Sequence, residues 1–288
     1  MAEPTVPRRV FVTGALGFVG RRLADRYRAA GANVAGVDVR SDPALGVVAG
    51  DITTAGDWQH ALAEADLVVH TAALVGMGGD EASSWRINCL GTRHVLDAAA
   101  RAGVGRLVHL SSIVAFGFDY PNGVDEHYPL RPNGVPYVDT KVASEQTVLQ
   151  SHAAGEVPCT IVRPGDVYGP GSHFWTVSPV RAIAAGRLVL PAQGRGHLSP
   201  VYIDDLVDGI VRAAGTANAA GNVFTLTGGE TVTTSAFFGH YARMLGKSSI
   251  PVAPTAVVVA LAATVGRLLG DGDVSPDAVR YIARQGGY

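Results

Sequence analysis

A glycine-rich turn near the N-terminus constrains the fold of this chain more than any other feature. The apolar run 10–12 leads through Thr13 into Gly14, Gly17 and Gly20, and an amphipathic stretch follows. A strand that passes through such a turn into a helix lets backbone N–H groups approach a pyrophosphate at the positive helix end. The spacing differs by one residue from the dinucleotide fingerprint Gly-x-Gly-x-x-Gly. A plain tight turn is the alternative.

Apolar, β-branched runs alternate with amphipathic stretches through the first part of the chain. The strand candidates are 10–12, 34–38, 67–70, 107–110 and 159–162, and the helix candidates are 18–30, 58–63, 84–102 and 136–153. Such alternation predicts βαβ units on a parallel sheet with helices on both faces. We therefore predict an α/β fold, a Rossmann-type doubly wound parallel sheet.

The pattern loosens after Arg163. Pro and Gly are frequent over 164–200, and a helix candidate at 203–214 and a strand candidate at 222–226 follow. We predict an NAD-binding Rossmann domain over residues 1–165 and, over 166–288, a smaller substrate-binding lobe, some segments of which return to the first domain. A ligand is expected in the cleft between the two.

Composition limits the classes of function. The 288 residues are 47% hydrophobic and carry a formal net charge of −2 with scattered Lys and Arg, so the chain can bury a full core and has no electrostatic footprint for nucleic acid. Cys89 and Cys159 are far apart and match neither a metal site nor a disulfide framework. We predict that both are buried apolar residues, and we expect no metal.

Two segments bear on location. No apolar stretch precedes the first strand, so we expect no signal peptide and a cytoplasmic protein. The run 255–265 is almost entirely apolar, but Arg267 and Asp271 interrupt it short of the roughly 18 to 20 residues of a membrane span. We interpret it as a buried or partner-packed helix, with contact at a membrane surface as the alternative.

Asp38 ends the second strand candidate, where an acid would accept hydrogen bonds from the adenosine ribose hydroxyls. An acid disfavours a phosphate there, which predicts NAD rather than NADP, although Arg40 is close enough to permit both. An ordinary turn residue is the alternative. Asp51 and Ile52 follow the next apolar run and could place a carboxylate near the adenine amino group.

Tyr137 and Lys141 lie four residues apart in a helix candidate, so they share one helix face. A free tyrosine has a pKa of about 10, and a nearby cation favours its phenolate, which brings proton transfer closer to neutral pH. The spacing alone is common on surface helices. Its weight comes from the surrounding motifs.

Together these motifs resemble an extended short-chain dehydrogenase/reductase, the superfamily often labelled NAD-dependent epimerase/dehydratase. The resemblance runs from Val10 to about Thr227. Its segments occur in order: the turn 13–20 with Phe18 and Val19, Asp38, Asp51-Ile52, His70-Thr-Ala-Ala73, Asn88-x-x-Gly91-Thr92, Leu110-Ser-Ser112, Tyr137-x-x-x-Lys141, Arg163-Pro-Gly-Asp-Val-Tyr-Gly-Pro-Gly171 and Val201-Tyr-Ile-Asp-Asp205.

The resemblance implies a role for each residue of the reaction centre. Tyr137 would be the general acid/base as hydride moves to or from the nicotinamide, and Lys141 would bind the nicotinamide ribose and lower the pKa of Tyr137. Ser112 would bond the substrate oxygen, with Ser111 as its neighbour beside the cofactor. Asn88 would help to order the site. The alternatives are a strand-end cap for the serines and a plain helix residue for Asn88.

The resemblance also implies the walls of the cofactor site. Small side chains at Thr71, Ala72 and Ala73 would lie beside the dinucleotide, and His70 would be a packed strand residue. The loop bordering the nicotinamide would comprise Pro164, Gly165 and Val167, and Asp204 and Asp205 would cap the helix that follows.

Two departures from sugar-nucleotide relatives bear on the substrate. This chain has Asp166 where many carry asparagine, and Leu198 where many carry arginine. Losing an amide and a cation weakens diphosphate binding, and the Asp166 carboxylate would repel a diphosphate if it faced the cleft. Ile113 and Val114 replace the Asp-Glu pair of the dehydratases, which disfavours dehydration.

Aromatic residues are expected on the lobe side of the cleft, where they would suit an apolar alcohol or ketone. They are Phe116, Phe118, Tyr168, Phe174 and Trp175. The alternative is that these rings form lobe core. The resemblance therefore leans towards 3β-hydroxysteroid dehydrogenase-like and dihydroflavonol reductase-like members.

The sequence thus predicts an NAD-dependent oxidoreductase that interconverts a secondary alcohol and a ketone on a non-nucleotide, hydrophobic substrate. An NAD-retaining sugar-nucleotide epimerase is the first alternative, and a non-catalytic dinucleotide-binding regulator is the second. By resemblance we also expect a homodimer formed through the helices that carry Asn88 and Tyr137.

Overall fold

A seven-stranded parallel sheet forms the centre of the larger part of the molecule in the computed structural model, which describes residues 6–269 and 275–288. Its strands lie in the order β10 (Val223–Leu226), β6 (Cys159–Pro164), β5 (Arg106–Leu110), β4 (Leu67–His70), β1 (Arg9–Thr13), β2 (Asn33–Asp38) and β3 (Val47–Ala49). The order reverses between β1 and β4. In open α/β sheets, ligands bind in the crevice outside the carboxyl ends of such strands.

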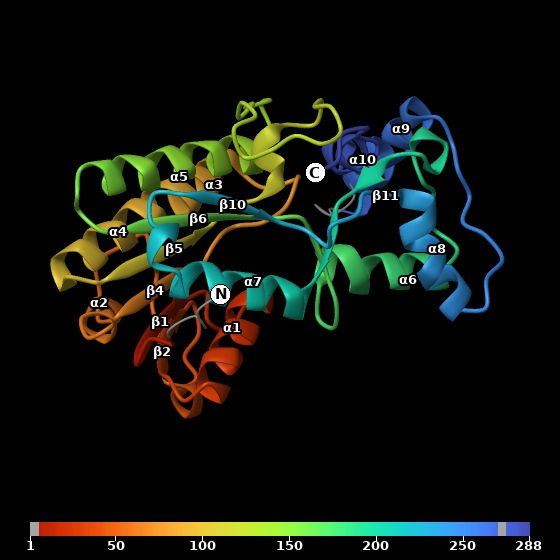
Figure 1. Ribbon diagram of the computed structural model, residues 1–288. Helices are drawn as coiled ribbons and strands as arrows, with labels where there is room; N and C mark the ends of the chain where they lie inside the picture. The colour runs from red at the N-terminus through yellow and green to blue at the C-terminus, as the bar shows by residue number, and fades with distance from the viewer. Residues whose placement is uncertain (1–5, 270–274) are drawn as a thin grey trace.

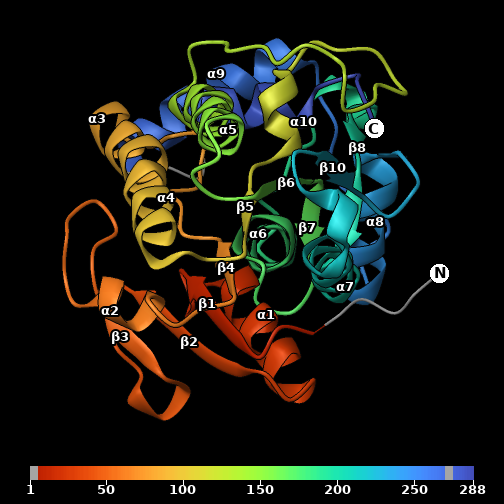
Figure 2. The same cartoon turned by 60° about the vertical axis from the view of Figure 1, so that its left-hand side comes forward.

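Helices cover both faces of this sheet (Figures 1 and 2). One layer consists of α1 (Phe18–Ala29) and α7 (Ile203–Gly215), and the other of α2 (Trp58–Leu62), α4 (Gly91–Ala102) and α5 (Pro136–Ala153). Alternate side chains of β1 enter the two cores: Val10 and Val12 pack with α1 and α7, whereas Phe11 packs on the other side. The predicted doubly wound Rossmann-type fold is confirmed.

The helix predicted over 84–102 begins earlier and is not uniform. It comprises α3 (Glu81–Trp85), a π-helical turn over Arg86–Leu90, and α4. Asp80 caps α3, because its carboxylate accepts a hydrogen bond of 2.8 Å from the Ser83 N–H. π-Turns within α-helices occur frequently at functional sites, and this one carries Asn88.

The region that looked irregular in the sequence contains short elements of a second unit. The strands β7 (Asp166–Tyr168) and β9 (Pro200–Tyr202) pair in parallel, and β8 (His197–Leu198) pairs antiparallel with β11 (Val232–Thr233). The helices α6 (Ser178–Ala184) and α8 (Thr234–Met244) pack beside them. Elements this short carry too few periods for a sequence pattern to reveal them. The helix α7 packs on the main sheet, and β10 belongs to it.

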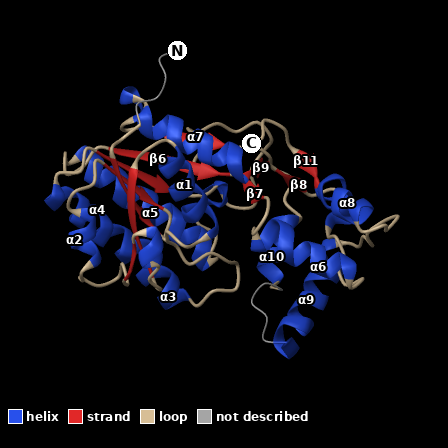
Figure 3. Ribbon diagram, turned by 90° about the horizontal axis from the view of Figure 1, so that it is seen from below, coloured by secondary structure: helices blue, strands red, loops and turns tan. Residues whose placement is uncertain are grey.

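The last two helices, α9 (Thr255–Leu269) and α10 (Pro276–Ile282), complete the lobe, and the chain ends between the lobe and the sheet (Figures 1 and 3). Val258 and Ala262 of α9 are buried against α10, but Val257 and Leu261 are 49% and 51% exposed. No helix within the described residues is long and apolar enough to cross a membrane. Asp271 lies outside the described residues.

Candidate active site

The glycine turn lies at the carboxyl end of β1, and its geometry requires glycine. Gly14 has a φ of 64°, in the left-handed region that favours glycine. A Cβ at Gly20 would lie 2.1 Å from the Gly14 carbonyl oxygen, so a side chain there is excluded. Gly17 is the N-cap of α1 and provides no side-chain cap. The first N–H groups of α1 are therefore not occupied by a capping side chain and are available to bind an anion.

Asp38 lies beside this turn. Its carboxylate accepts hydrogen bonds from the N–H groups of Leu16 (3.0 Å) and Val39 (2.8 Å), which fix its orientation at the end of β2. A surface cavity of about 260 Å³ adjoins it and is lined by Leu16, Arg21, Arg40, Ser41 and Asp42. The carboxylate and the cavity fit a ribose, and Arg40 is within the same cavity.

Asp51 and Ile52 have different environments. Asp51 is exposed and accepts a hydrogen bond of 2.8 Å from the Thr53 N–H, the first of the interactions that lower the pKa of Asp51. Ile52 is buried, and a Cβ built at Gly91 would lie 2.8 Å from its Cδ1 atom. Only the Asp51 carboxylate is therefore accessible to a ligand.

The loop after β4 contacts the glycine turn directly. The Thr71 hydroxyl donates a hydrogen bond of 2.6 Å to the Thr13 carbonyl oxygen, and the Ala72 N–H donates one of 3.2 Å to the Thr13 hydroxyl. A Cβ at Gly14 would lie 2.9 Å from the Ala72 Cα. The predicted borders of the dinucleotide thus form one continuous wall, which Ala73 extends along the chain.

Tyr137 and Lys141 occupy the first two turns of α5, which begins at Pro136. Tyr137 is 8% exposed and Lys141 is 4% exposed. The Lys141 ammonium lies 5.9 Å from the centre of the Tyr137 ring and donates a hydrogen bond of 2.8 Å to the Leu110 carbonyl oxygen. The shared helix face thus places a cation beside the phenol, at the carboxyl end of β5.

The pKa values of this pair are set mainly by burial. Burial raises the pKa of Tyr137 to about 12 and outweighs the hydrogen bond with Ser112, which lowers it. Burial also lowers the pKa of Lys141 to about 8, against the smaller opposing effect of Glu145. The expectation that Lys141 brings the Tyr137 pKa below its usual value is wrong for the protein without a bound cofactor, because loss of solvent disfavours the phenolate. Tyr137 therefore holds its proton at neutral pH.

The two serines at the end of β5 differ. Ser112 is the N-cap of a 3₁₀ turn over Ile113–Phe116, and its hydroxyl accepts a hydrogen bond of 3.3 Å from the Val114 N–H. It also interacts with Tyr137, so capping and a position beside the phenol are compatible. The Ser111 hydroxyl is buried without a partner among the described residues. An orphaned buried hydroxyl beside the site fits a ligand group.

Asn88, in the π-helical turn, forms hydrogen bonds with the loop after β4 and with α5. Its side-chain oxygen accepts a hydrogen bond of 2.8 Å from the Leu74 N–H, and its amide nitrogen donates to the Leu74 carbonyl oxygen and the Thr140 hydroxyl, each at 3.0 Å. The loop after β4 is thereby fixed to α5 three residues beyond Tyr137. Asn88 acts through these residues as a positioning residue.

Asp166 is buried, and the expectation that its charge repels a diphosphate does not apply. Its carboxylate accepts hydrogen bonds from the Tyr281 hydroxyl (3.0 Å), the Ser199 N–H (2.8 Å) and the Arg284 guanidinium. Arg284 also lies over the Tyr281 ring, 3.9 Å from its centre. The Asp166 charge is neutralised by an ion pair that joins β7 to the C-terminal residues, and it does not face a cleft.

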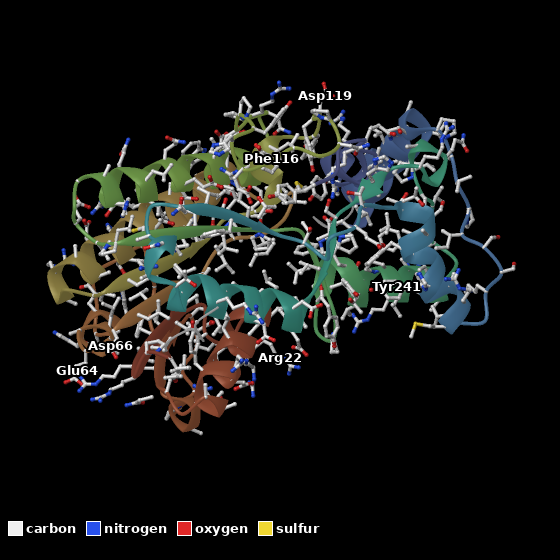
Figure 4. The ribbon with its side chains drawn as sticks, viewed as in Figure 1. Arg22, Glu64, Asp66, Phe116, Asp119 and Tyr241 are labelled. Atoms are coloured by element: carbon white, nitrogen blue, oxygen red, sulfur yellow. The ribbon has the colours of Figure 1, made fainter. Side chains whose placement is uncertain are left out.

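Several residues expected to line the cleft are core residues instead. Phe116 is fully buried under Arg163 and stacks on Tyr288, as its packed surroundings in Figure 4 also show. Leu198 is buried in the lobe core with Phe237 and Phe238. Phe116 therefore belongs to a core cluster with Tyr120 and Tyr288 that is separate from the lobe core. Neither Phe116 nor Leu198 is available to line a cleft.

The other four aromatic residues differ among themselves. Tyr168 is half-buried against Phe237 of α8. Phe174 is 38% exposed, and its ring lies next to Gly76 in the loop after β4. Trp175 packs both with the lobe core and with the residues around Tyr137. Phe118, like Trp175, packs against that second cluster.

Apolar side chains from distant segments surround Tyr137. This cluster contains Val114, Val135, Val138 and Tyr281, with Met77, Phe118 and Trp175 packed against it. Sequence reasoning missed Met77 and Tyr281. The glycines around Met77 were a usable signal of a loop that approaches the site, but nothing local in α10 marks Tyr281.

The segment after β6 has structural reasons for its sequence. Pro164 ends β6 and pairs with Leu226 of β10. A Cβ at Gly165 would lie 2.2 Å from the Ser199 carbonyl oxygen, so the close approach of that segment requires glycine. Val167 is half-buried in the core beneath α7. Their contact with a nicotinamide stays a prediction.

Two smaller expectations need correction or qualification. The N-cap of α7 has no side-chain hydrogen bond, and Asp204 instead forms an ion pair with Arg22 of α1, so capping by Asp204 and Asp205 is wrong. Cys159 is buried, as predicted, but Cys89 is only half-buried.

Comparisons with known proteins give one family. The model of the NAD dependent epimerase/dehydratase family matches residues 10–226. The chain is 34% identical over 235 residues to a 3-beta-hydroxysteroid dehydrogenase of Mycolicibacterium neoaurum, covering 74% of this chain and 63% of that protein. It is 31% identical over 249 residues to a UDP-glucose 4-epimerase of Mycolicibacterium smegmatis, covering 78% and 79%. The chain thus spans less than two thirds of that hydroxysteroid dehydrogenase.

Solved structures give the same fold. MoeE5 in complex with UDP-glucose and NAD superposes with a TM-score of 0.75 at 27% identity, over 85% of each chain. The UDP-glucose 4-epimerase of Thermus thermophilus in complex with NAD superposes with a TM-score of 0.73 at 24% identity, over 85% of this chain and 86% of that one.

Proposed function

Because the chain belongs to the NAD-dependent epimerase/dehydratase family, we propose that it is an NAD-dependent oxidoreductase that interconverts a secondary alcohol and a ketone on a non-nucleotide, hydrophobic substrate. One observation carries the choice of substrate class. A cluster of apolar and aromatic side chains packs around Tyr137, and its members come from four separate parts of the chain: Met77, the segment 114–138, Trp175 and Tyr281.

The fit to NAD is supported by this chain's own geometry. The glycine turn, whose close contacts exclude side chains, would hold the pyrophosphate, Asp38 would hold the adenosine ribose, and Lys141 would hold the nicotinamide ribose. Arg40 leaves NADP as the less favoured cofactor. When bound, NAD supplies the acceptor or donor of the hydride.

The residues of the chain supply the proton chemistry. Tyr137 keeps its proton at neutral pH, because burial raises its pKa to about 12, so its hydroxyl can donate to a ketone oxygen. In the reverse direction the acceptor of the alcohol proton is the Tyr137 phenolate, so Tyr137 must first release its own proton. Ser112 orients the same oxygen, and the Lys141 cation stabilises the phenolate that forms. General acid/base catalysis of this kind contributes about 10² to 10⁴ in rate.

The apolar cluster favours a substrate without a diphosphate. A buried diphosphate needs cations or amide donors. Leu198 occupies the position where, by the resemblance, many sugar-nucleotide members carry arginine, and it is buried in the lobe core. Arg284 is held by Asp166. The cluster therefore suits a steroid-like or aryl alcohol better than a nucleotide sugar.

The direct test is oxidation of steroid and aryl secondary alcohols by the purified protein with NAD, followed at the absorbance band of the reduced nicotinamide. We expect net NADH formation with at least one apolar alcohol and none with small polar ones. Interconversion of a UDP-sugar without added cofactor or net NADH would instead establish the epimerase. That alternative has support in the similarity to MoeE5, which was solved with UDP-glucose and NAD.

A non-catalytic dinucleotide-binding regulator is the remaining alternative. It predicts that NAD binds while no alcohol or sugar is turned over. The presence of Ser112, Tyr137 and Lys141 around one point speaks against it. Turnover that is unchanged in a Tyr137→Phe variant would remove the proposed acid and reopen this alternative.

We also propose that the protein is a cytoplasmic homodimer that associates through the helices carrying Asn88 and Tyr137. Trp85 and Leu90, which flank Asn88 in the sequence, are 41% and 46% exposed, and exposed large apolar side chains support association. Light scattering at working concentration tests it, and a monomer would contradict it.

A further inference from the structure

His70 at the end of β4 is a buried titratable residue for which the proposed chemistry has no use. Both of its ring nitrogens nevertheless have partners. Nδ1 lies 2.7 Å from the Thr13 hydroxyl, and Nε2 lies 3.0 Å from the Thr92 hydroxyl. Thr13 directly precedes the glycine turn, and Thr92 is in the first turn of α4. His70 therefore joins two segments on opposite sides of its strand.

The hydrogen bonds around His70 fix its tautomer. Thr92 donates its hydroxyl proton to the Asn88 carbonyl oxygen at 2.6 Å, so it can only accept from His70, and Nε2 carries the proton. Nδ1 must then accept from the Thr13 hydroxyl, whose oxygen is free to accept from the Ala72 N–H at 3.2 Å. Every donor thus finds an acceptor with a neutral imidazole. Burial, assisted by Lys141, lowers the pKa of His70 to about 3 and keeps it neutral.

The chain of hydrogen bonds continues to the helix of the proposed acid. The Asn88 amide donates to the Thr140 hydroxyl at 3.0 Å, and Thr140 donates to the Tyr137 carbonyl oxygen at 3.2 Å. The relay Thr13, His70, Thr92, Asn88 and Thr140 is buried throughout. It runs from the glycine turn to the first turn of α5.

We propose that His70 is a positioning residue that fixes the glycine turn relative to the helix of Tyr137, and so aligns the bound dinucleotide with the proton donor. This inference rests on the proposed function. A relay in which these buried donors and acceptors are already paired resists rearrangement, because a shift leaves a buried polar atom unpaired. The neighbouring His109 offers no such link. Its Nδ1 has no partner among the described residues, and its Nε2 contacts only Ser144.

The test interrupts the relay by substitution at two residues and measures whether the two substitutions have non-additive effects. Thr92→Val removes the hydroxyl between His70 and Asn88 with little change in shape, and Thr92→Ser retains it. His70→Asn removes the contact with Thr92. Thr147→Val is the matched control, since Thr147 of α5 donates to the Ala143 carbonyl oxygen outside the relay. Thermal unfolding verifies that each variant is folded at the assay temperature.

The double-mutant cycle of His70→Asn and Thr92→Val is measured for kcat and for the NAD dissociation constant by calorimetry. We expect each single variant to lower kcat about five- to tenfold, the effect of one lost buried hydrogen bond, and to weaken NAD binding by a smaller factor. The double variant should be no worse than the single ones, because residues of one network are not additive. Thr92→Ser should recover most of the loss, and Thr147→Val should change neither quantity.

Multiplicative effects in the double variant would overturn the proposal, because they assign His70 and Thr92 to independent local roles. A lower unfolding temperature with unchanged kcat and NAD affinity would also overturn it, because it leaves the relay with a structural role alone. If the wild-type protein binds NAD but oxidises none of the alcohols, the proposed function fails. The cycle measured on NAD binding then still decides whether the relay exists.

Discussion

Lys141 lies one helical turn beyond Tyr137, with its ammonium 5.9 Å from the centre of the phenol ring and bonded to the carbonyl oxygen at the end of β5. The pair therefore connects α5 to the strand end where Ser112 follows. This arrangement fixes the cation independently of any ligand. The chemistry proposed for Tyr137 depends on it.

Replacing Tyr137 by Phe removes the proton donor while preserving the ring in its apolar cluster. We expect turnover to fall by about 10² to 10⁴, the contribution of general acid/base catalysis, while NAD affinity changes little. Steady-state kinetics and NAD calorimetry on the same preparation measure both. Tyr27→Phe is a matched control, because the buried Tyr27 hydroxyl has no hydrogen-bond partner in the described part of the chain. A similar loss in both variants would contradict a specific role for Tyr137.

The pH dependence of ketone reduction should report Lys141. Its pKa is lowered to about 8 by burial, whereas that of Tyr137 is raised to about 12. As pH rises through about 8, Lys141 loses its charge before Tyr137 loses its proton, so kcat/KM should fall on the alkaline side. A Lys141→Arg variant keeps its charge to high pH, so the alkaline fall of its kcat/KM should shift to higher pH. If the variant has measurable turnover and the fall does not shift, the titration belongs to another group.

The depressed pKa of Lys141 also predicts how stability depends on pH. Between about 8 and 10.5 the native state binds fewer protons than the unfolded state, so the free energy of unfolding attributable to Lys141 rises with pH across that window and is lowest below it. The change amounts to about 3 kcal/mol over the window, to order of magnitude. Urea unfolding of the wild type and of Lys141→Met at several pH values measures it. We expect the difference between the two proteins to vary across this window, and a constant difference would contradict the prediction.

The buried ion pair of Asp166 and Arg284 should be essential for stability. Arg284→Met leaves the Asp166 carboxylate buried without its cation, which costs about 3 to 5 kcal/mol for pairs of this kind. Arg22, which is labelled in Figure 4, forms an exposed pair with Asp204 that Arg22→Met breaks. Exposed pairs contribute only about 0 to 1 kcal/mol. Urea unfolding compares the two variants. Equal losses of unfolding free energy in the two variants would show that the buried pair contributes no more to stability than the exposed one.

Gly20→Ala tests the cradle expected to hold the pyrophosphate. The new Cβ would lie 2.1 Å from the Gly14 carbonyl oxygen, so the turn must move, and NAD binding should be abolished or weakened at least about tenfold. Gly239 of α8 provides the control, because a Cβ there meets only the end of the Arg243 side chain at 3.5 Å. Gly239→Ala should stabilise the protein by about 0.5 to 1 kcal/mol. Calorimetry with NAD and thermal unfolding distinguish the two results.

The features that sequence predicted well are local. The strand, the glycine turn and α1 follow one another directly, and the strand ends carrying Asp38, Thr71 and Ser112 meet at one edge because parallel strands share a direction. The fold class and the approximate location of the cofactor site were therefore accessible without coordinates. The strand order, with its switch between β1 and β4, came from the structure.

The environment of individual side chains was not accessible in the same way. Asp166 is neutralised by Arg284, which is 118 residues away in the chain, and Phe116 is covered by Tyr288. Tyr281 reaches the cluster around Tyr137 from the last helix. The residues near Asp166 and Phe116 in the sequence do not predict that Arg284 and Tyr288 are their partners, because these contacts depend on how distant segments pack.

The sequence by itself determined that this chain forms a doubly wound parallel sheet, with a glycine turn after the first strand and a tyrosine and a lysine on one helix face. These features follow from periodicity, turn geometry and strand direction, which are local or directional rules. Only the tertiary structure decided which side chains surround the tyrosine and which charges are neutralised. Burial makes a charge or a ring depend on its partners in space, and those partners come from segments that sequence proximity does not connect.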